Sequence, residues 1–208
     1  MPIFSDKDFR NFLGEPIESH HDWGCEWRFS ISRESLNKYS DTLRDTLYHH
    51  HTFFDLHTEI AELGFVLSAQ AMKDRYSGNP TDHNTQMGNL GEVLGAHFAR
   101  AYLNFCGEPI YPKRYNTNIE QSQKGIDILG FKDILSPAEL LIGEVKARRD
   151  FNQGAAREDY ETLCRHQNDE NIFKILHFVC AYFRGDKESL KNVERHRMND
   201  TPIQYLIA

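Results

Sequence analysis

Two short apolar segments in the second half of the chain have the pattern of core strands. Residues 125–130 read Gly-Ile-Asp-Ile-Leu-Gly, and residues 140–148 begin Leu-Leu-Ile-Gly-Glu-Val-Lys. Their apolar, partly β-branched residues and bounding glycines are typical of buried strands. Alternate residues of a strand share a face, so Glu144 and Lys146 are expected to point the same way and Val145 into the opposite layer.

The two segments carry a combination of charges that suggests a site. If the strands are neighbours, Asp127 joins Glu144 and Lys146, and two carboxylates meet one ammonium. Such a cluster can hold a divalent cation through hard oxygen ligands, with a water beside the lysine. Chance would supply roughly 1.5 Asp/Glu-X-Lys triplets in a chain of this composition, and this triplet is the only one here. The alternative is an edge-strand pair that faces water.

A third acid lies on an expected helix from Asn89 to Phe105. One side of this helix is apolar, and the other carries mostly small residues, which let a helix lie close to a sheet. Glu92 stands among the small residues, at the expected helix start, and therefore joins the candidate site. The alternative is that Glu92 only complements the positive end of the helix dipole in the first turn.

The remaining pattern predicts an α/β core behind a mainly helical N-terminal region. The cluster of turn-forming residues at 77–82 divides the chain into residues 1–85 and 86–208, although neither part has a convincing core of its own. Further expected elements are a strand at 25–31, a helix capped by Ser32 or Ser35, a helix at 54–76, a strand Tyr111–Asn116, a helix Asn171–Phe183 and, as one alternative, a short strand at the C-terminal end.

Charge limits the function classes. The net charge of −7 over 208 residues argues against a general nucleic-acid coat protein, which would be basic. Residues 113–149 are nevertheless rich in Lys and Arg, and become positive if a metal binds Asp127 and Glu144. The expected phosphate contacts there are Lys113, Arg114, Lys124, Arg148 and Arg149. A solvated charged rim is the alternative for each.

The cellular setting is expected to be the cytoplasm. The four cysteines are widely spaced and show no Cys-X-X-Cys pair, which favours reduced core residues over a disulfide framework or a zinc site. No apolar run reaches the length of a membrane span, and the N-terminal residues lack the basic and apolar parts of a signal peptide.

In order, the chain gives a helix with Glu92, a strand, a strand with Asp127, a strand with Glu144-Val145-Lys146, and a helix. This order resembles the PD-(D/E)XK, or restriction-endonuclease-like, superfamily over roughly residues 88–185. The spelling Gly-Glu-Val-Leu, Gly-Ile-Asp-Ile and Gly-Glu-Val-Lys around these residues is most similar to the HamA nuclease family of Hachiman antiphage defence. One departure is Ile126, where the superfamily motif has proline.

The resemblance implies a central mixed sheet flanked by helices and a metal-dependent deoxyribonuclease. Asp127, Glu144 and the Val145 carbonyl would bind Mg²⁺ or Mn²⁺. Glu92 would hold a water or a second ion, and Lys146 would orient the attacking water or stabilise the oxyanion. Two other classes remain open: a catalytically silent module of the same fold that binds nucleic acid or protein, and a structural interaction protein with an accidental triplet.

A partner is expected as well. The resemblance implies a helicase-type ATPase beside the nuclease, and the sequence holds no nucleotide-binding motif of its own. Residues 1–85 are expected to supply the interface, because aromatic residues often anchor interfaces. The aromatic residues on which this expectation rests are Trp23, Trp27, Phe53, Phe54 and Phe65.

Overall fold

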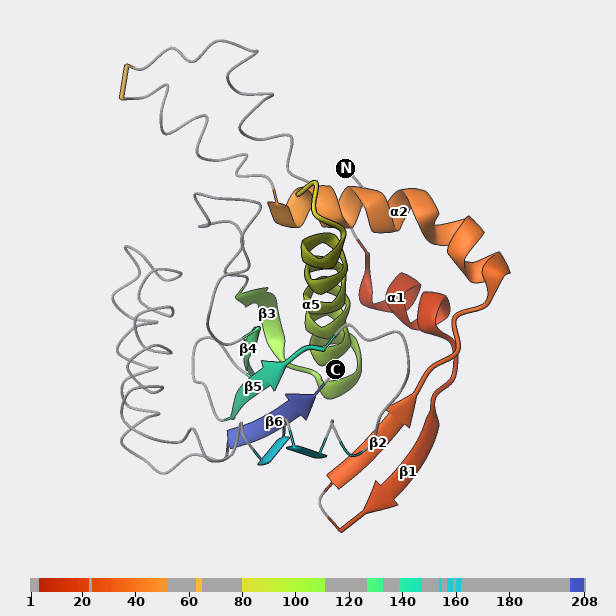
Figure 1. Ribbon diagram of the computed structural model, residues 1–208, viewed down its shortest axis with the longest axis vertical. Coiled ribbons are helices and arrows are strands. Elements are labelled where there is room, and N and C mark those ends of the chain that lie inside the picture. The colour runs from red at the N-terminus through yellow and green to blue at the C-terminus, as the bar shows by residue number, and fades with distance from the viewer. Residues whose placement is uncertain are drawn as a thin grey trace.

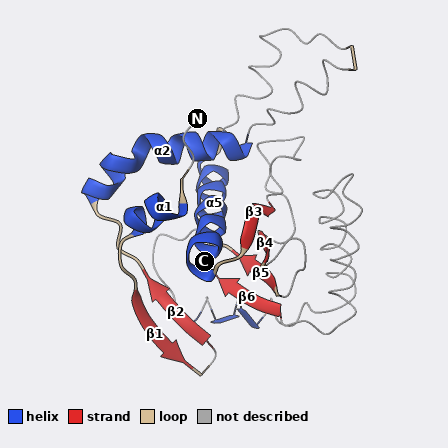
Figure 2. Ribbon diagram, turned by 180° about the vertical axis from the view of Figure 1, so that it is seen from behind, coloured by secondary structure: helices blue, strands red, loops and turns tan. Residues whose placement is uncertain are grey.

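A computed structural model describes residues 4–22, 24–51, 63–64, 80–110, 127–132, 139–146, 154, 157–158, 160–161 and 203–207. Figures 1 and 2 show helix α5 (His83–Leu103) at the centre, with α2 (Arg33–His51) across its upper end, α1 (Asp6–Leu13) beside it and a four-stranded sheet on the side away from α1. A two-stranded hairpin, β1 and β2, extends away from this assembly. The described part of the chain is thus a mixed α/β structure, as the sequence predicts.

The N-terminal elements are α1 (Asp6–Leu13), β1 (Ile17–His21), β2 (Gly24–Arg28) and α2 (Arg33–His51). Ser5 caps α1, because its hydroxyl accepts the Asp8 backbone N–H at 3.0 Å. Ser32 caps α2 in the same way through the Ser35 N–H, also at 3.0 Å. The expected strand and capped helix of this region are therefore confirmed.

Helix α5 spans His83–Leu103, so it begins six residues before the position predicted from the apolar pattern. The cause is Asp82, whose carboxylate accepts the Thr85 N–H at 2.7 Å and the Thr85 hydroxyl at 2.9 Å. These hydrogen bonds lower the pKa of Asp82. Glu92 consequently lies in the third turn, and the alternative role of first-turn dipole complementation is wrong. The helix ends at Asn104, which adopts the left-handed conformation at φ 57°.

The sheet contains β3 (Cys106–Ile110), β4 (Ile128–Phe131), β5 (Leu140–Glu144) and β6 (Ile203–Ile207) in that spatial order. The first three strands are antiparallel, whereas β6 runs parallel to β5. The C-terminal segment is thus the strand that the sequence left as one alternative. The described strand after α5 is β3, and the strand predicted at Tyr111–Asn116 lies outside the described residues, as do the helices predicted at 54–76 and Asn171–Phe183.

One hydrophobic core joins the N-terminal helices to the sheet. Its buried members come from both parts of the chain: Phe4, Phe9, Phe12, Leu13, Tyr39, Phe98, Ala99, Ala101, Phe105, Ile128, Leu141 and Leu206. Helix α5 supplies the middle of this core and packs against α1, α2, β3 and β4. A fragment that starts near residue 86 would expose the α5 side of the core to water.

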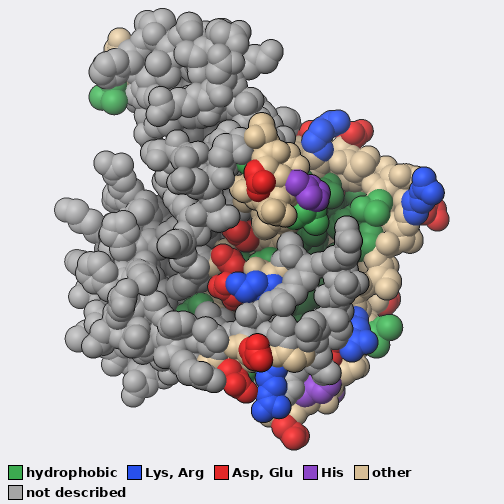
Figure 3. Space-filling view, viewed as in Figure 1, with side chains coloured by type: hydrophobic (Ala, Val, Ile, Leu, Met, Phe, Trp, Pro, Cys, Tyr) green, Lys and Arg blue, Asp and Glu red, His purple; other side chains and the backbone are tan. Residues whose placement is uncertain are grey.

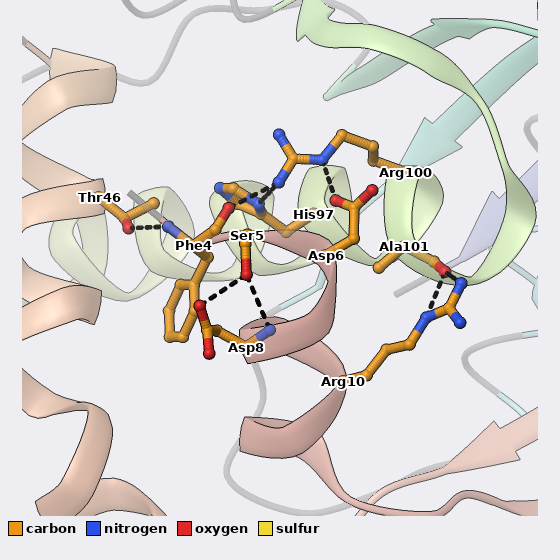
Figure 4. A network of polar contacts seen from close by, with 9 residues as sticks. All are labelled: Phe4, Ser5, Asp6, Asp8, Arg10, Thr46, His97, Arg100 and Ala101. Atoms are coloured by element: carbon orange, nitrogen blue, oxygen red, sulfur yellow. Dashed lines mark hydrogen bonds and ion pairs between the residues drawn. The ribbon is translucent and has the colours of Figure 1, made fainter. Parts of the chain in front are cut away.

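Polar contacts fix α1 on α5 (Figure 4). Arg100 donates to the Phe4 carbonyl at 2.8 Å and to the Asp6 carboxylate at 2.5 Å. It also lies 3.1 Å from Nδ1 of His97, a fully buried side chain. Burial, followed by the charge of Arg100, lowers the pKa of His97 to about 3, so this histidine is neutral in the folded chain at neutral pH.

Candidate functional site

The ends of β4 and β5 bring the predicted aspartate and the Glu-Val-Lys triplet together. Ile128 of β4 pairs with Gly143 of β5, so Asp127 and Glu144 occupy the next position of the same antiparallel register. The Asp127 carboxylate accepts the backbone N–H of Val145 through Oδ2 at 2.8 Å. This hydrogen bond holds the Asp127 side chain against the triplet, one residue beyond the paired strands. The prediction that the two strands are neighbours is therefore confirmed.

Close packing explains the glycine that precedes the triplet. A Cβ atom on Gly143 would lie 2.9 Å from Cβ of Ile128, a distance that real Cβ atoms do not reach. Ile128 and Leu141 are fully buried, at 1% and 0% exposure, on the sheet face that joins the core. Glycine at position 143 therefore lets β4 and β5 approach each other next to the two carboxylates.

Alternation beyond the strand end places the triplet as predicted. Val145 packs against the hydrophobic core, whereas Lys146 reaches Glu144 and donates to its Oε1 at 2.5 Å. Strand β5 itself ends at Glu144, so Val145 and Lys146 continue its direction without ladder hydrogen bonds to β4. Side-chain exposures of 26% for Glu144 and 38% for Lys146 leave this ion pair at the edge of solvent.

The opposite end of the same two strands carries a second ion pair. Lys132 donates to both carboxylate oxygens of Glu139, at 2.8 and 2.9 Å, and its backbone N–H donates to the Glu139 carbonyl at 3.1 Å. This pair closes the strand pairing at that end. It supplies a matched carboxylate and lysine that lie on the same two strands but away from the candidate site.

Glu92 is half-buried in the third turn of α5, and α5 packs against β3 and β4. Figure 3 shows acidic side chains gathered beside a Lys or Arg side chain near the middle of one face. Within the described part of the chain, however, the carboxylate oxygens of Glu92, Asp127 and Glu144 do not all lie within 4.8 Å of one another. Asp127 and Glu144 therefore carry the metal hypothesis, and a metal-linked role for Glu92 stays a prediction.

The donor set of Asp127 and Glu144 fits Mg²⁺ or Mn²⁺. Both ions prefer carboxylate, carbonyl and water oxygens. Two half-buried carboxylates at adjacent strand ends supply such oxygens, and the N–H bond from Val145 holds one carboxylate in place. Lys146 is the immediate cationic neighbour of Glu144, so a metal ion bound there would share that carboxylate with the ammonium.

Several predicted residues fall outside this description. All five expected phosphate contacts, Lys113, Arg114, Lys124, Arg148 and Arg149, lie outside the described residues, and so do Trp23, Phe53, Phe54 and Phe65. Trp27 is described, and its ring lies 5.5 Å from that of Phe98, partly buried against the core. The fold thus uses this tryptophan, which weakens the case for it as an interface anchor.

The fold also brings together a group of side chains that the sequence pattern does not predict. Glu18, His20 and Cys25 meet on the β1–β2 hairpin, with ligand atoms all within 4.8 Å of one another. The sequence carries this signal as Glu-X-His with its histidine five residues before a cysteine, but only the hairpin register places Cys25 opposite His20.

Comparisons with known proteins agree on one family. The family model described as HamA matches residues 6–204 of this chain. A relative from Bacillus cereus, described as Hachiman protein HamA, is 37% identical over 87 residues. That alignment covers 40% of this chain and 29% of the relative. No solved structure matches the chain.

Proposed function

The chain belongs to the HamA family, and on that basis we propose that it is a metal-dependent nuclease that hydrolyses DNA phosphodiester bonds in antiphage defence. The relative's printed description supplies the defence context. The single observation that carries the chemistry is the hydrogen bond from Val145 to Asp127, because it holds one carboxylate against the Glu144–Lys146 pair.

The topology supports a restriction-endonuclease-like core. Helix α5 precedes three antiparallel strands, β3, β4 and β5, and β6 adds a fourth strand parallel to β5. A mixed sheet of this kind supports the proposal, because it carries Asp127 and Glu144 at the same end of its two central strands. The glycine contact between β4 and β5 makes that end compact.

The roles of the residues follow from their chemistry. Asp127 and Glu144 would hold Mg²⁺ or Mn²⁺, with the Val145 carbonyl as a further ligand. When bound, the ion supplies a water of lowered pKa and neutralises negative charge on the phosphate. Lys146 would orient a water or donate to a phosphate oxygen, since its ammonium already lies beside Glu144. Glu92 would hold a water or a second ion from the α5 side.

A second candidate function has one observation in its favour. The oxygens of Glu92, Asp127 and Glu144 do not converge within 4.8 Å in the described structure. A module of the same fold that binds nucleic acid or protein without cleaving it would not need them to converge. Cleavage, rather than binding alone, therefore decides between the two functions.

The deciding experiment compares two lysines on the same pair of strands. Purified full-length chain is incubated with plasmid, linear DNA and RNA in Mg²⁺, Mn²⁺ or EDTA. Lys146→Ala is expected to reduce cleavage at least about 10²-fold, because a group acting on the transition state is lost. Lys132→Ala at the opposite strand end is expected to cleave like the wild type. Absence of cleavage in every metal, with nucleic-acid binding retained, would favour the silent module.

We further propose that a helicase-type ATPase gates this activity. A nuclease without a visible means of sequence readout would endanger its own cell unless another component controlled it. The interface is assigned to residues 1–85, where Leu36 on α2 is 44% exposed.

The partner test uses the full-length chain, because a fragment lacking residues 1–85 would lose part of the core. A candidate helicase-type ATPase is co-expressed and co-purified with wild type, with Leu36→Glu and with Met87→Glu, a control at a similarly exposed position (41%) near the start of α5. The proposal predicts loss of the helicase only with Leu36→Glu. Absence of the helicase from the wild-type preparation, or equal recovery with both variants, would contradict it.

A further inference from the structure

The β1–β2 hairpin carries three different metal-ligand side chains on one face. Glu18 and His20 are two residues apart on β1, so they share a face, and Cys25 of β2 lies directly opposite His20 in the register. We propose that Glu18, His20 and Cys25 form a Zn²⁺ site that is separate from the carboxylates at the ends of β4 and β5.

The distances between these ligand atoms suit one small ion. Oε1 of Glu18 lies 3.1 Å from Sγ of Cys25 and 3.4 Å from Nε2 of His20, and all three atoms lie within 4.8 Å of one another. Zinc takes sulfur at about 2.3 Å and nitrogen or oxygen at about 2.0 Å, which puts tetrahedral ligands roughly 3–4 Å apart. The side chains are thus already close to the spacing that coordination requires.

The chemistry of the donors selects the metal. Thiolate, imidazole and carboxylate are the three ligand types of protein zinc sites, whereas Mg²⁺ prefers oxygen alone. With three protein ligands, a water completes the tetrahedron. Glu18 and a Cys25 thiolate together balance the two positive charges of the ion, and neutral His20 adds none.

A surface cluster held only by its own polar contacts is the competing explanation. His20 and Glu18 are 79% and 48% exposed, and a polar contact between such exposed side chains adds little stability. The carboxylate on the other face of the hairpin has a cationic partner. There Glu26 accepts from His21 at 2.9 Å and from Arg28 at 2.5 Å, so its charge is already matched by a cation.

The hairpin also gives the ion a structural use. An isolated two-stranded hairpin is marginally stable, and here Trp27 attaches β2 to the core through Phe98. A metal ion bound by β1 and β2 would add a cross-strand link closer to the turn. Metal binding would therefore stabilise the paired strands, as it does in small metal-stapled folds.

Protonation of the thiol makes the site pH-dependent. Zinc binds the thiolate form of cysteine, so metal binding must displace the Cys25 thiol proton, which goes to solvent as the sulfur–metal bond forms. Affinity is expected to increase as pH rises.

The test is a Co²⁺ titration of the full-length chain with its thiols kept reduced, since Co²⁺ takes zinc positions and gives a visible spectrum. A thiolate ligand produces a sulfur-to-cobalt charge-transfer band. We expect a saturable band at one equivalent that added Zn²⁺ removes. Cys25→Ser should abolish the band and His20→Ala should weaken binding at least about tenfold.

Two controls make the outcome specific. His21→Ala removes a histidine from the opposite face of the same hairpin, and Asp127→Asn alters the other candidate metal site; both should keep the band and its affinity. A band that survives Cys25→Ser, one that weakens equally in His21→Ala, or the absence of any band in the wild type would overturn the proposal.

Discussion

Asp127 has two separable roles, and two substitutions at this position distinguish them. Asp127→Asn removes the negative charge that a metal ion needs but keeps a side-chain oxygen that can accept the Val145 N–H. Asp127→Ala removes both. We expect both variants to lose cleavage at least about 10²-fold, whereas only the alanine variant loses stability.

The size of the stability effect follows from the hydrogen bond itself. The Val145 N–H donates to the carboxylate at 2.8 Å, and both residues are half-buried. Leaving a buried donor without its acceptor costs about 1–3 kcal/mol. For a chain of this size, 1 kcal/mol corresponds to about 2–4 °C in Tm. A cost near 2 kcal/mol would thus lower the Tm of Asp127→Ala by about 4–8 °C.

Metal-dependent melting completes this test. Mg²⁺ at about ten times its Kd stabilises a chain that binds it by about 1.4 kcal/mol, and has no such effect on a chain without the site. The wild type is expected to gain a few degrees, and Asp127→Asn nothing, although its Tm in EDTA should equal or exceed that of the wild type because charge repulsion with Glu144 is relieved. Undiminished cleavage by Asp127→Asn would contradict the metal-binding role of Asp127, and equal Tm values for the two variants would contradict its structural role.

Three further predictions concern packing, pH and the path of the nucleic acid. Gly143→Ala should destabilise the fold by about 1–3 kcal/mol in urea unfolding, because its Cβ would lie 2.9 Å from a buried isoleucine. Gly88→Ala should instead stabilise the fold by up to about 1 kcal/mol, because Gly88 lies in helix α5 and the added Cβ would meet no atom within 4 Å beyond its chain neighbours and the helix backbone. His97 is neutral when folded and its pKa is lowered from 6.5 to about 3, so the unfolded chain binds the extra proton between these values. Stability should therefore fall as pH drops through that window, by up to about 1.4 kcal/mol per unit, and His97→Gln should show a shallower fall in the same unfolding measurements. Replacing Arg148 and Arg149 by alanine should weaken DNA binding on all sequences and flatten the salt dependence of binding. An unchanged salt dependence would show that the nucleic acid does not contact these two arginines.

The strand pair was predictable because its pattern is local. Apolar residues bounded by glycines identify β4 and β5. Alternation predicts that Val145 faces away from Glu144 and Lys146, and the contact of Val145 with the core and the Lys146–Glu144 ion pair confirm this. What the pattern could not give was the pairing itself. The hydrogen bond from Val145 to Asp127 depends on a register that only the folded sheet fixes.

The helix and the hairpin show where sequence patterns lose information. The apolar pattern predicts the start of α5 too late because the first turns are mostly polar, and the cap at Asp82 rather than the apolar stripe sets the boundary. Helix α1 does not follow from the apolar pattern, because its eight residues give too short a periodic signal, although Ser5 is a regular cap. The cluster around Cys25 needs cross-strand neighbours, which no spacing along the chain reveals.

No described helix combines the length and apolar character needed to cross a membrane. The described aromatic residues of region 1–85 are not available as interface anchors. Phe4, Phe9 and Phe12 are buried in the shared core, and Trp27 packs on Phe98. The aromatic content of the N-terminal part therefore serves the fold first. Exposed positions such as Leu36 remain the places where a partner can be tested.

The most direct measurement is cleavage of plasmid DNA by the full-length chain and by two glutamate variants of equal charge change. Glu144→Gln alters the candidate site, and Glu139→Gln alters the carboxylate paired with Lys132 at the other end of β5. The account predicts cleavage in Mg²⁺ or Mn²⁺ by the wild type and by Glu139→Gln, and at least about 10²-fold less by Glu144→Gln or in EDTA. Cleavage that persists in EDTA, or that Glu144→Gln leaves intact, would contradict it.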